Sequence, residues 1–301
     1  MIDCLDIGGS GIKGACARGA ADLLPLGRVA TPLGDLDAFV AAIKEVLARS
    51  PAGPAATVAI SIAGVVDPDS GRIKVANIPC LDGLPLAAVL TGRLARPVVV
   101  GNDGDCFALA EAVAGAGRAH RIVFGAILGT GVGGGLVIDG RLVTGRGGYA
   151  GEWGHAPVAA TRVGTPPVEL PRFPCGCGLS GCVDTLGGAR GMERLHAHLG
   201  GPPMGSVAIV AGWRAGDATA ARTVDCYMEI VAPPLALVVN VVGADIVPVG
   251  GGLAGSPQLI ERLDREVRGR LLRRTDRPLV VPARLAIEPA LIGAAILAGA
   301  R

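Results

Sequence analysis

A strand, a glycine-rich turn and a second strand occur twice in this chain, in residues 2–18 and again in residues 122–141. The two turns read Gly8-Gly9-Ser10-Gly11 and Gly129-Thr130-Gly131-Val132-Gly133. Successive backbone N–H groups in such a turn form a concave anion site, whereas an ordinary hairpin needs only one or two glycines. The turns therefore predict phosphate binding, and their repetition predicts two α/β lobes with a central cleft.

Both turns also match the spacing of a dinucleotide-binding fingerprint, as Gly9, Gly11 and Gly14 illustrate. That fingerprint requires a helix to begin at the glycines. The segment from Ile12 to Ala17 instead alternates in polarity and contains a glycine, and the segment after the second turn is similar. Both segments predict strands. A nicotinamide-dependent oxidoreductase is therefore disfavoured.

A cluster of sulfur and nitrogen ligands follows the second hairpin. Cys175, Cys177 and Cys182 stand within eight residues, and His155 lies 20 residues before the first of them. Zinc(II) prefers four tetrahedral nitrogen or sulfur ligands, so a Cys3His set leaves no position open for water. The alternative is a group of unrelated core thiols, which explains the other, scattered cysteines but not this cluster. We expect a structural zinc site here.

Charge and hydropathy exclude several classes of partner. The formal net charge is +2 with scattered arginines, so no basic face favours nucleic acid. The N-terminal segment lacks the basic and apolar regions of a signal peptide. The longest apolar run, Ile230 to Val249, contains Pro233, Pro234 and Asp245, which predicts a buried helix and a strand rather than a membrane span. We expect a cytoplasmic protein with no membrane or nucleic-acid partner.

Helices and strands alternate through the rest of the chain, which predicts an α/β fold. Helical spacing marks residues 35–48, 84–94, 105–116, 186–199, 207–242, 257–272 and 290–298, and short strands are expected at 57–62, 97–100, 246–249 and 279–281. Pro233 and Pro234 are expected to start, kink or break the long helix.

Asp103 stands where a predicted strand ends and a predicted helix begins, directly after Gly101 and Asn102. The N–H groups and dipole of a helix N-terminus favour an ionised carboxylate there. The same position suits an ordinary N-cap, a role that Asp103 or Asp105 could fill. Taken alone, this local pattern favours the cap over a catalytic role.

These motifs together resemble the ROK sugar kinases, which have the actin-like ATPase (ribonuclease H-like) fold. The resemblance covers nearly the whole chain. It rests, in order, on Asp6-Ile7-Gly8-Gly9-Ser10, Gly101-Asn102-Asp103, Gly129-Thr130-Gly131-Val132-Gly133, Gly151-Glu152-x-Gly154-His155, Cys175-Gly176-Cys177-Gly178-x-x-Gly181-Cys182 and Gly250-Gly251-Gly252. Bacterial N-acetylglucosamine kinases and glucokinases are the members that it resembles most, with fructokinases near.

The resemblance implies that Asp103 is the general base, which removes the proton from the sugar 6-hydroxyl as that oxygen attacks the terminal phosphate of ATP. It implies that the hexose is bound by Gly64, Asn77, Asn102, Asp103, Glu152, His155 and Asp184. The family usually has a glutamate at the last of these positions. Because aspartate is one methylene shorter, its contact near the anomeric carbon is expected to be longer or bridged by water.

The same resemblance implies ATP, Mg²⁺ and a structural Zn²⁺. The phosphates and Mg²⁺ would be held by Asp6, Gly8, Gly9, Ser10, Gly11, Lys13, Gly129, Thr130, Gly131 and Gly133, and adenosine would lie against Gly250, Gly251 and Gly252. Zinc would be bound by His155, Cys175, Cys177 and Cys182. The other ring nitrogen of His155 would then face the sugar.

The resemblance also implies an organisation in lobes. We expect an N-terminal lobe of residues 1–117, joined by a closing helix at 289–301, and a C-terminal lobe of residues 118–288 that carries the zinc-bound loop. We also expect a homodimer.

Several alternatives remain at this stage. Glucose, N-acetylglucosamine, N-acetylmannosamine, mannose and fructose differ around carbons 1 and 2, which the motifs do not resolve. The first glycine turn resembles that of polyphosphate glucokinases, but those enzymes generally lack the cysteine cluster, so ATP is favoured. A sugar-responsive regulator of the same family is the alternative from another class. No DNA-binding module precedes Asp6 in this sequence, and no basic patch replaces one.

Overall fold

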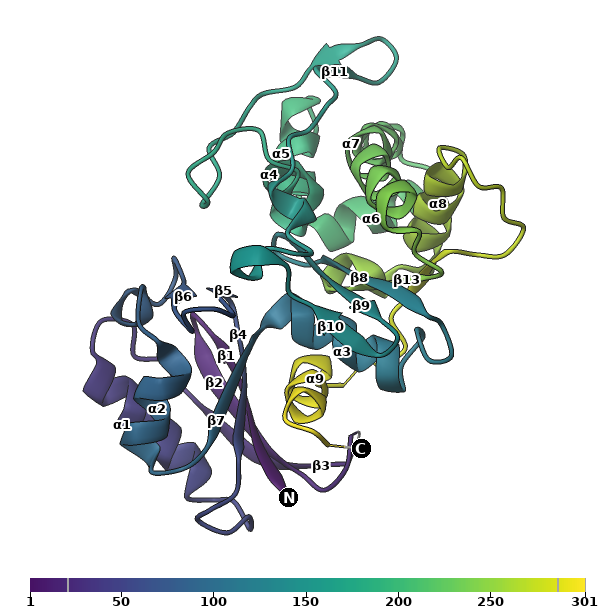
Figure 1. Cartoon of the computed structure of the whole chain (residues 1–301). Helices are drawn as coiled ribbons and strands as arrows, with labels where there is room; N and C mark the ends of the chain where they lie inside the picture. Colours follow the sequence, from purple (N-terminus) through teal and green to yellow (C-terminus); the bar gives the residue numbers. More distant parts are fainter. Residues whose placement is uncertain (21, 286, 301) are drawn as a thin grey trace. The chain divides into compact units, whose positions relative to one another are not determined.

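Two five-stranded sheets form the framework of the chain in the computed structural model, which describes residues 1–20, 22–285 and 287–300 (Figure 1). Contacts group the chain into two units. The first unit is Met1–Arg118, Gly135–Gly151 and Leu285–Arg301, and the second is Ala119–Gly134 and Glu152–Arg284. The lobe boundaries expected from the sequence stay a prediction.

The first sheet has the strand order β3-β2-β1-β4-β7. Its strands are β1 (Ile2–Gly8), β2 (Gly11–Ala17), β3 (Leu23–Val29), β4 (Val58–Ile62) and β7 (Val98–Asn102). β1, β4 and β7 are parallel, with Asp6 opposite Ser61 and Ser61 opposite Gly101. The carboxyl ends of these three strands therefore meet at one edge, where ligands bind in open α/β sheets.

Helices cover both faces of the first sheet. Its helices are α1 (Leu36–Leu47), α2 (Leu86–Leu94), α3 (Asp103–Ala114) and α9 (Pro289–Leu297). Phe39 of α1 and Leu86 of α2 share one apolar core with Leu5 and Ile60 of the sheet. On the opposite face, Leu291 of α9 and Cys106 of α3 form a second apolar cluster with a different set of strand residues. These four helices confirm the predicted ones to within two residues at each end.

Short elements complete the first unit. They are β5 (Val65–Val66), β6 (Ile73–Lys74) and the 3₁₀ helices Pro79–Leu81 and Arg146–Gly148.

Gly293 allows α9 to approach α3 at the backbone. A Cβ atom added at Gly293 would lie 1.8 Å from the carbonyl oxygen of Cys106, which has no room to move within a packed helix pair. We therefore expect Gly293→Ala to lower the free energy of unfolding by about 1–3 kcal/mol or more. The matched control is Gly92→Ala in α2, where an added Cβ meets no atom of the described residues within 4 Å. That change should raise stability by up to about 1 kcal/mol through helix propensity. Urea midpoints that shift equally would contradict this packing.

The second sheet has the strand order β10-β9-β8-β13-β14. Its strands are β8 (Ile122–Leu128), β9 (Val132–Ile138), β10 (Arg141–Val143), β13 (Val247–Gly250) and β14 (Val280–Pro282). β8, β13 and β14 are parallel. A strand follows each glycine turn, β2 after the first and β9 after the second, as predicted. The helix that a dinucleotide fingerprint needs is therefore replaced by a strand in both places.

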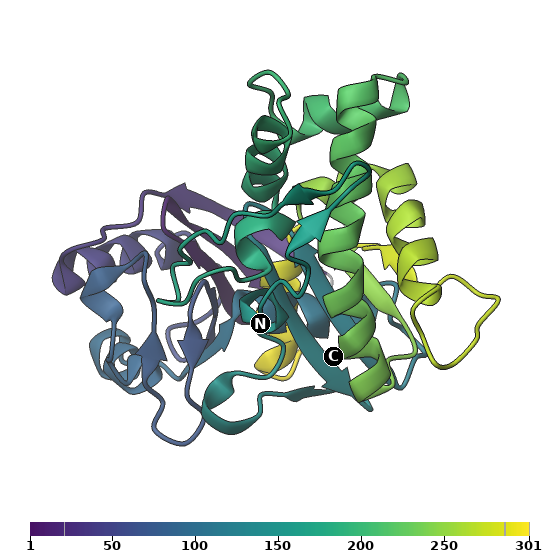
Figure 2. The same cartoon turned by 90° about the horizontal axis from the view of Figure 1, so that it is seen from above.

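The second unit also contains helices and a two-stranded ribbon. The helices are α4 (Asp184–Gly187), α5 (Ala189–His198), α6 (Ser206–Arg214), α7 (Ala218–Val242) and α8 (Pro257–Arg268), and the ribbon pairs β11 (Arg162–Val163) with β12 (Val168–Glu169). Two 3₁₀ helices lie at the ends of motifs found in the sequence. Trp153–His155 is the end of the Glu-Trp-Gly-His segment, and Gly252–Gly255 begins at the last glycine of the Gly250-Gly251-Gly252 motif. α7 lies beside α8 in both views (Figure 1, Figure 2).

α7 continues through Pro233 and Pro234 as one helix of 25 residues, so the expectation that these prolines start or break it is wrong. It ends at Gly243, which takes the left-handed conformation. By length and composition α7 could cross a membrane, but 56% of its most apolar window is buried inside the protein. Its buried Tyr227 donates a hydrogen bond to the carbonyl oxygen of Gly187 at 2.6 Å. These features identify a core helix, as the sequence predicted.

Candidate functional site

The first glycine turn joins β1 to β2 at the ligand edge of the first sheet. A Cβ added at Gly9 would lie 3.3 Å from Asn77 Nδ2, so the Asn77 side chain lies close to the turn. Arg28 crosses the other side of the turn. Its Nη2 donates to Ser10 Oγ at 3.0 Å, and its Nε would be 2.2 Å from a Cβ at Gly11. A guanidinium beside a glycine turn can bind phosphate oxygens. Arg28 was missed from the sequence, although it lies opposite Lys13 in the β2–β3 ladder.

Asp6 and Lys13 face one another across the β1–β2 hairpin. Burial raises the pKa of the Asp6 carboxyl, the Lys13 ammonium opposes that shift, and the Glu288 carboxylate adds to it. Lys13 Nζ lies 3.0 Å from both carboxylate oxygens of Glu288, a residue that sequence analysis did not identify. Glu288 has a φ of 51°, in the left-handed region that is uncommon for residues other than glycine. A divalent cation beside Asp6 would favour its charged form.

Asn102 is the N-cap of α3. Its Oδ1 accepts hydrogen bonds from the N–H of Gly104 at 2.7 Å and of Asp105 at 3.2 Å, and its Nδ2 donates to the carbonyl oxygen of Gly64 at 3.1 Å. The cap therefore links the ends of β4 and β7. The structure removes the simple explanation of Asp103 as an N-cap, because Asn102 has that role.

Asp103 is the first residue of α3 and is half-buried. Its Oδ1 accepts from the N–H of Gly104 at 2.9 Å. The positive end of the helix dipole favours a carboxylate at this position. In the first unit the structure thus brings Gly64 into contact with Asn102, the residue directly before Asp103, and brings Asn77 against the Gly9 turn.

Glu152 precedes the 3₁₀ helix Trp153–His155 in the second unit and His155 is its last residue, with Glu152 Oε2 3.6 Å from His155 Nε2. Burial raises the pKa of the Glu152 carboxyl, His155 lowers it and Asp184 raises it further. Between them, the buried Trp153 donates from Nε1 to the carbonyl oxygen of Gly133 at 2.7 Å. Trp153 is a third residue that the sequence reasoning missed. It attaches the Glu-Trp-Gly-His segment to the second glycine hairpin.

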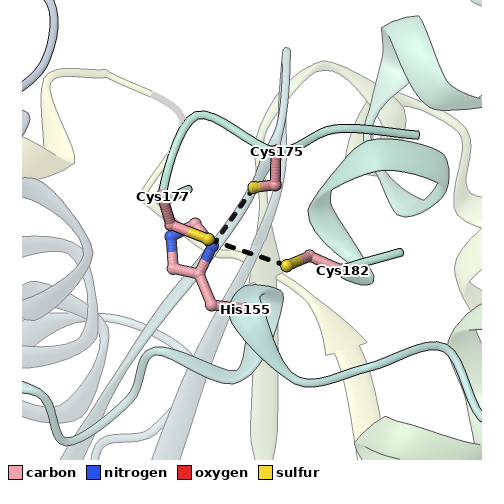
Figure 3. Close-up of side chains that lie close together, drawn as sticks. All are labelled: His155, Cys175, Cys177 and Cys182. Carbon is pink, nitrogen blue, oxygen red and sulfur yellow. Dashed lines mark hydrogen bonds between the residues drawn. The ribbon is translucent and has the colours of Figure 1, made fainter. Parts of the chain in front are cut away.

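His155, Cys175, Cys177 and Cys182 converge on one point (Figure 3). One ligand atom from each lies within 4.8 Å of all the others. His155 Nδ1 is 3.5 Å from Cys175 Sγ, and Cys177 Sγ is 3.7 Å from Cys182 Sγ. Tetrahedral zinc with usual bond lengths would separate a sulfur from a nitrogen by about 3.6 Å and two sulfurs by about 3.8 Å. The separation of the sulfurs also exceeds a disulfide bond by far. The four residues therefore fit a zinc ion.

The second glycine hairpin lies against two other segments of its unit. Gly251 has a φ of 87°, and a Cβ there would lie 2.5 Å from the N of Gly129 and the O of Leu128. The Gly250–Gly252 turn and the Gly129–Gly133 turn are thus in backbone contact. On another side, Asp184 Oδ1 accepts from the N–H of Val132 at 2.7 Å. The residue expected to meet the sugar therefore contacts the glycine hairpin.

Comparison with known proteins gives consistent matches over the whole chain. The model of the ROK family matches residues 2–301. The N-acetylgalactosamine kinase AgaK of Shewanella sp. (strain ANA-3) is 37% identical over 295 residues, or 97% of this chain and 95% of that relative. The N-acetyl-D-glucosamine kinase of Pectobacterium atrosepticum is 36% identical over 272 residues, or 90% of each chain.

A solved structure with the same fold is a ROK family glucokinase from Streptomyces griseus in complex with glucose and AMPPNP. It is 28% identical, with a TM-score of 0.78 and coverage of 98% of each chain. This likeness confirms the actin-like ATPase fold that the motifs predicted.

Proposed function

The chain belongs to the ROK family, and we propose that it is a kinase that transfers the terminal phosphate of ATP to the 6-hydroxyl of a hexose or N-acetylhexosamine. Relatives that align over 90% or more of this chain are named kinases of amino sugars. The observation that carries the proposal is the position of Asp103, a carboxylate in the first turn of α3 beside a cap that another residue supplies.

Asp103 is the proposed general base. In phosphoryl transfer the transition state is loose, so rate depends mainly on alignment of the attacking oxygen and on neutralisation of charge. A carboxylate hydrogen-bonded to the 6-hydroxyl aligns that oxygen and accepts its proton. Asn102, through its contact with Gly64, holds the loop beside Asp103, and Gly64, Asn77, Glu152 and His155 are proposed to bind further sugar hydroxyls.

The two glycine hairpins are the proposed phosphate-binding elements. Their backbone N–H groups, together with the side chains of Ser10, Lys13 and Thr130, would hold the phosphate oxygens, and Asp6 would hold the magnesium ion directly or through water. That ion, when bound, supplies charge neutralisation at the phosphates. The Gly250–Gly252 turn is proposed to border adenosine. Arg28, which donates to Ser10, joins this proposed set.

The Cys3His group is proposed to hold one zinc ion with a structural role. The donor set fills four positions, so no site remains for water or substrate on the metal. His155 directs Nδ1 to the sulfurs and Nε2 toward Glu152. Binding of the metal at Nδ1 would fix the orientation of the ring, and with it the nitrogen that we propose to face the sugar.

Amino sugars are the favoured class of substrate. The relatives add N-acetylgalactosamine, which sequence analysis did not consider, to N-acetylglucosamine. Glucose, mannose, N-acetylmannosamine and fructose remain alternatives of the same reaction type. The proposal includes a cytoplasmic location, which the free thiols of the cysteines support. We also propose a homodimer, as the resemblance implies.

The proposal predicts sugar-dependent release of ADP. The protein would be mixed with Mg-ATP and each of glucose, mannose, fructose, N-acetylglucosamine, N-acetylgalactosamine and N-acetylmannosamine, and ADP would be followed in a coupled assay. We expect at least one hexose to raise ADP release well above the rate without sugar, with an N-acetylhexosamine giving the highest kcat/KM. Release that no sugar stimulates would contradict the proposed function. Replacing ATP with polyphosphate tests the alternative donor.

A further inference from the structure

Asp184 forms a direct contact with the second glycine hairpin. Its Oδ1 accepts a hydrogen bond from the N–H of Val132 at 2.7 Å. The same oxygen also lies close to Gly131, because a Cβ atom added at Gly131 would be 2.2 Å from it. A hydrogen bond to a charged acceptor is stronger than one between neutral groups. The carboxylate therefore restrains the turn at Gly131 and Val132.

The residues that follow Asp184 continue along the same hairpin. A Cβ at Gly188 would lie 2.6 Å from both the Cα of Gly131 and the carbonyl oxygen of Thr130. The N–H of Ala189 donates to the carbonyl oxygen of Gly129 at 2.7 Å. The start of α4 and the start of α5 thus support the turn along its length.

The opposite support comes from the segment that carries His155. Trp153 donates to the carbonyl oxygen of Gly133, and a Cβ at Gly154 would lie 2.2 Å from the carbonyl oxygen of Val132. Each supporting segment is adjacent in sequence to a residue of the Cys3His group: Gly154 precedes His155, and Asp184 follows Cys182 by two residues. Asp184 Oδ2 is also 3.8 Å from Cys175 Sγ.

We propose that Asp184 is a positioning residue for the second glycine hairpin and acts on the nucleotide phosphates through it, not on the sugar. This inference rests on the proposed kinase function for its kinetic part only. By accepting the Val132 N–H, the carboxylate sets the conformation of the turn and so the direction of its other N–H groups. The Cys3His group fixes both segments that support the turn, one through His155 and the other through Cys182. The ligand cluster and the hairpin therefore form one connected structure.

The experiment compares Asp184→Ala, which removes the acceptor, with Asp184→Asn, which keeps an acceptor oxygen of similar shape. The control is Asp217→Ala, because Asp217 likewise accepts from a single backbone N–H, that of Ala220, at 2.7 Å in the same unit. Three quantities are measured: amide hydrogen exchange of residues 129–134, KM for Mg-ATP against KM for the sugar, and zinc per chain.

For Asp184→Ala we expect exchange at residues 129–134 to be at least about tenfold faster and KM for Mg-ATP to rise by about tenfold, as loss of a charged hydrogen bond implies. The sugar KM should stay within about twofold and the zinc content should be unchanged. Asp184→Asn should restore most of the protection, and Asp217→Ala should leave both KM values unchanged.

Unchanged exchange together with a rise confined to the sugar KM would overturn the proposal and return Asp184 to the sugar. If the wild-type protein phosphorylates no sugar, the proposed function fails, but the exchange comparison still decides whether Asp184 holds the hairpin.

Discussion

Replacing Asp103 with asparagine is expected to lower kcat by about 10²–10⁴-fold, the usual contribution of a general base, while the dissociation constant for the sugar stays within about threefold. Asparagine has nearly the same shape and keeps an oxygen that can accept from the Gly104 N–H, as Asp103 Oδ1 does. It cannot take the proton of the 6-hydroxyl. Steady-state kinetics and calorimetric sugar binding would measure the two effects separately.

The matched control for that variant is Asp35→Asn. Asp35 also stands at a helix N-terminus, where its Oδ1 accepts from the N–H of Asp37 and Ala38. Asparagine is an equally good N-cap, so stability and kcat should both be unchanged. A near-normal kcat for Asp103→Asn would show that this carboxylate is not the base.

Replacing Cys177 with serine is expected to remove the metal. The wild-type protein should contain about one zinc per chain, and the variant close to none, because a hydroxyl is a poor ligand for zinc at neutral pH. Cys177 is the exposed member of the group, so the substitution disturbs little else. Since a structural metal stabilises the fold that binds it, the melting temperature should fall by several degrees.

Cys80→Ser is the control for the metal prediction. Cys80 is partly buried in the first unit, with its Sγ 3.9 Å from the carbonyl oxygen of Pro32, and among the described residues it belongs to no ligand group. Its zinc content should equal that of the wild type by elemental analysis. A wild-type protein that is free of metal yet fully active would refute the structural role of the Cys3His group.

The hairpins could be predicted because they depend on neighbouring residues. β1 and β2 are mostly apolar on either side of the turn, and Gly8 pairs with Gly11 directly across it. Alternation after the glycines distinguishes a strand from a helix without knowledge of the rest of the chain. The Cys3His cluster could be predicted for a similar reason, because three of its ligands lie in one short loop.

Contacts between distant residues could not be predicted from the pattern. Lys13 pairs with Glu288, which is 275 residues away, and Trp153 donates to the carbonyl oxygen of Gly133, which is 20 residues earlier and separated from it by β10. No periodicity marks such partners, because they depend on how strands and loops pack. Asp184 gives another example: its position in the motif predicts a sugar contact, which stays a prediction, but nothing in the pattern marks its hydrogen bond to the N–H of Val132, 52 residues earlier in the chain.

The prolines of α7 show how packing can override a local preference. Two adjacent prolines remove backbone donors and predict a helix boundary. Here they are flanked by the buried Ala232 and Leu235, and the helix begins at a cap by Asp217 and ends at Gly243. Burial of both flanks stabilises the helix enough to carry it through the prolines.

The most direct test of the central claim follows ADP and sugar phosphate in the same reaction. The protein would be incubated with Mg-ATP and its best hexose, and in parallel with the 6-deoxy form of that sugar. The account predicts one sugar 6-phosphate for each ADP by ³¹P NMR and no sugar-dependent ADP release with the 6-deoxy analogue. A phosphate at another carbon, or equal release with the analogue, would contradict it.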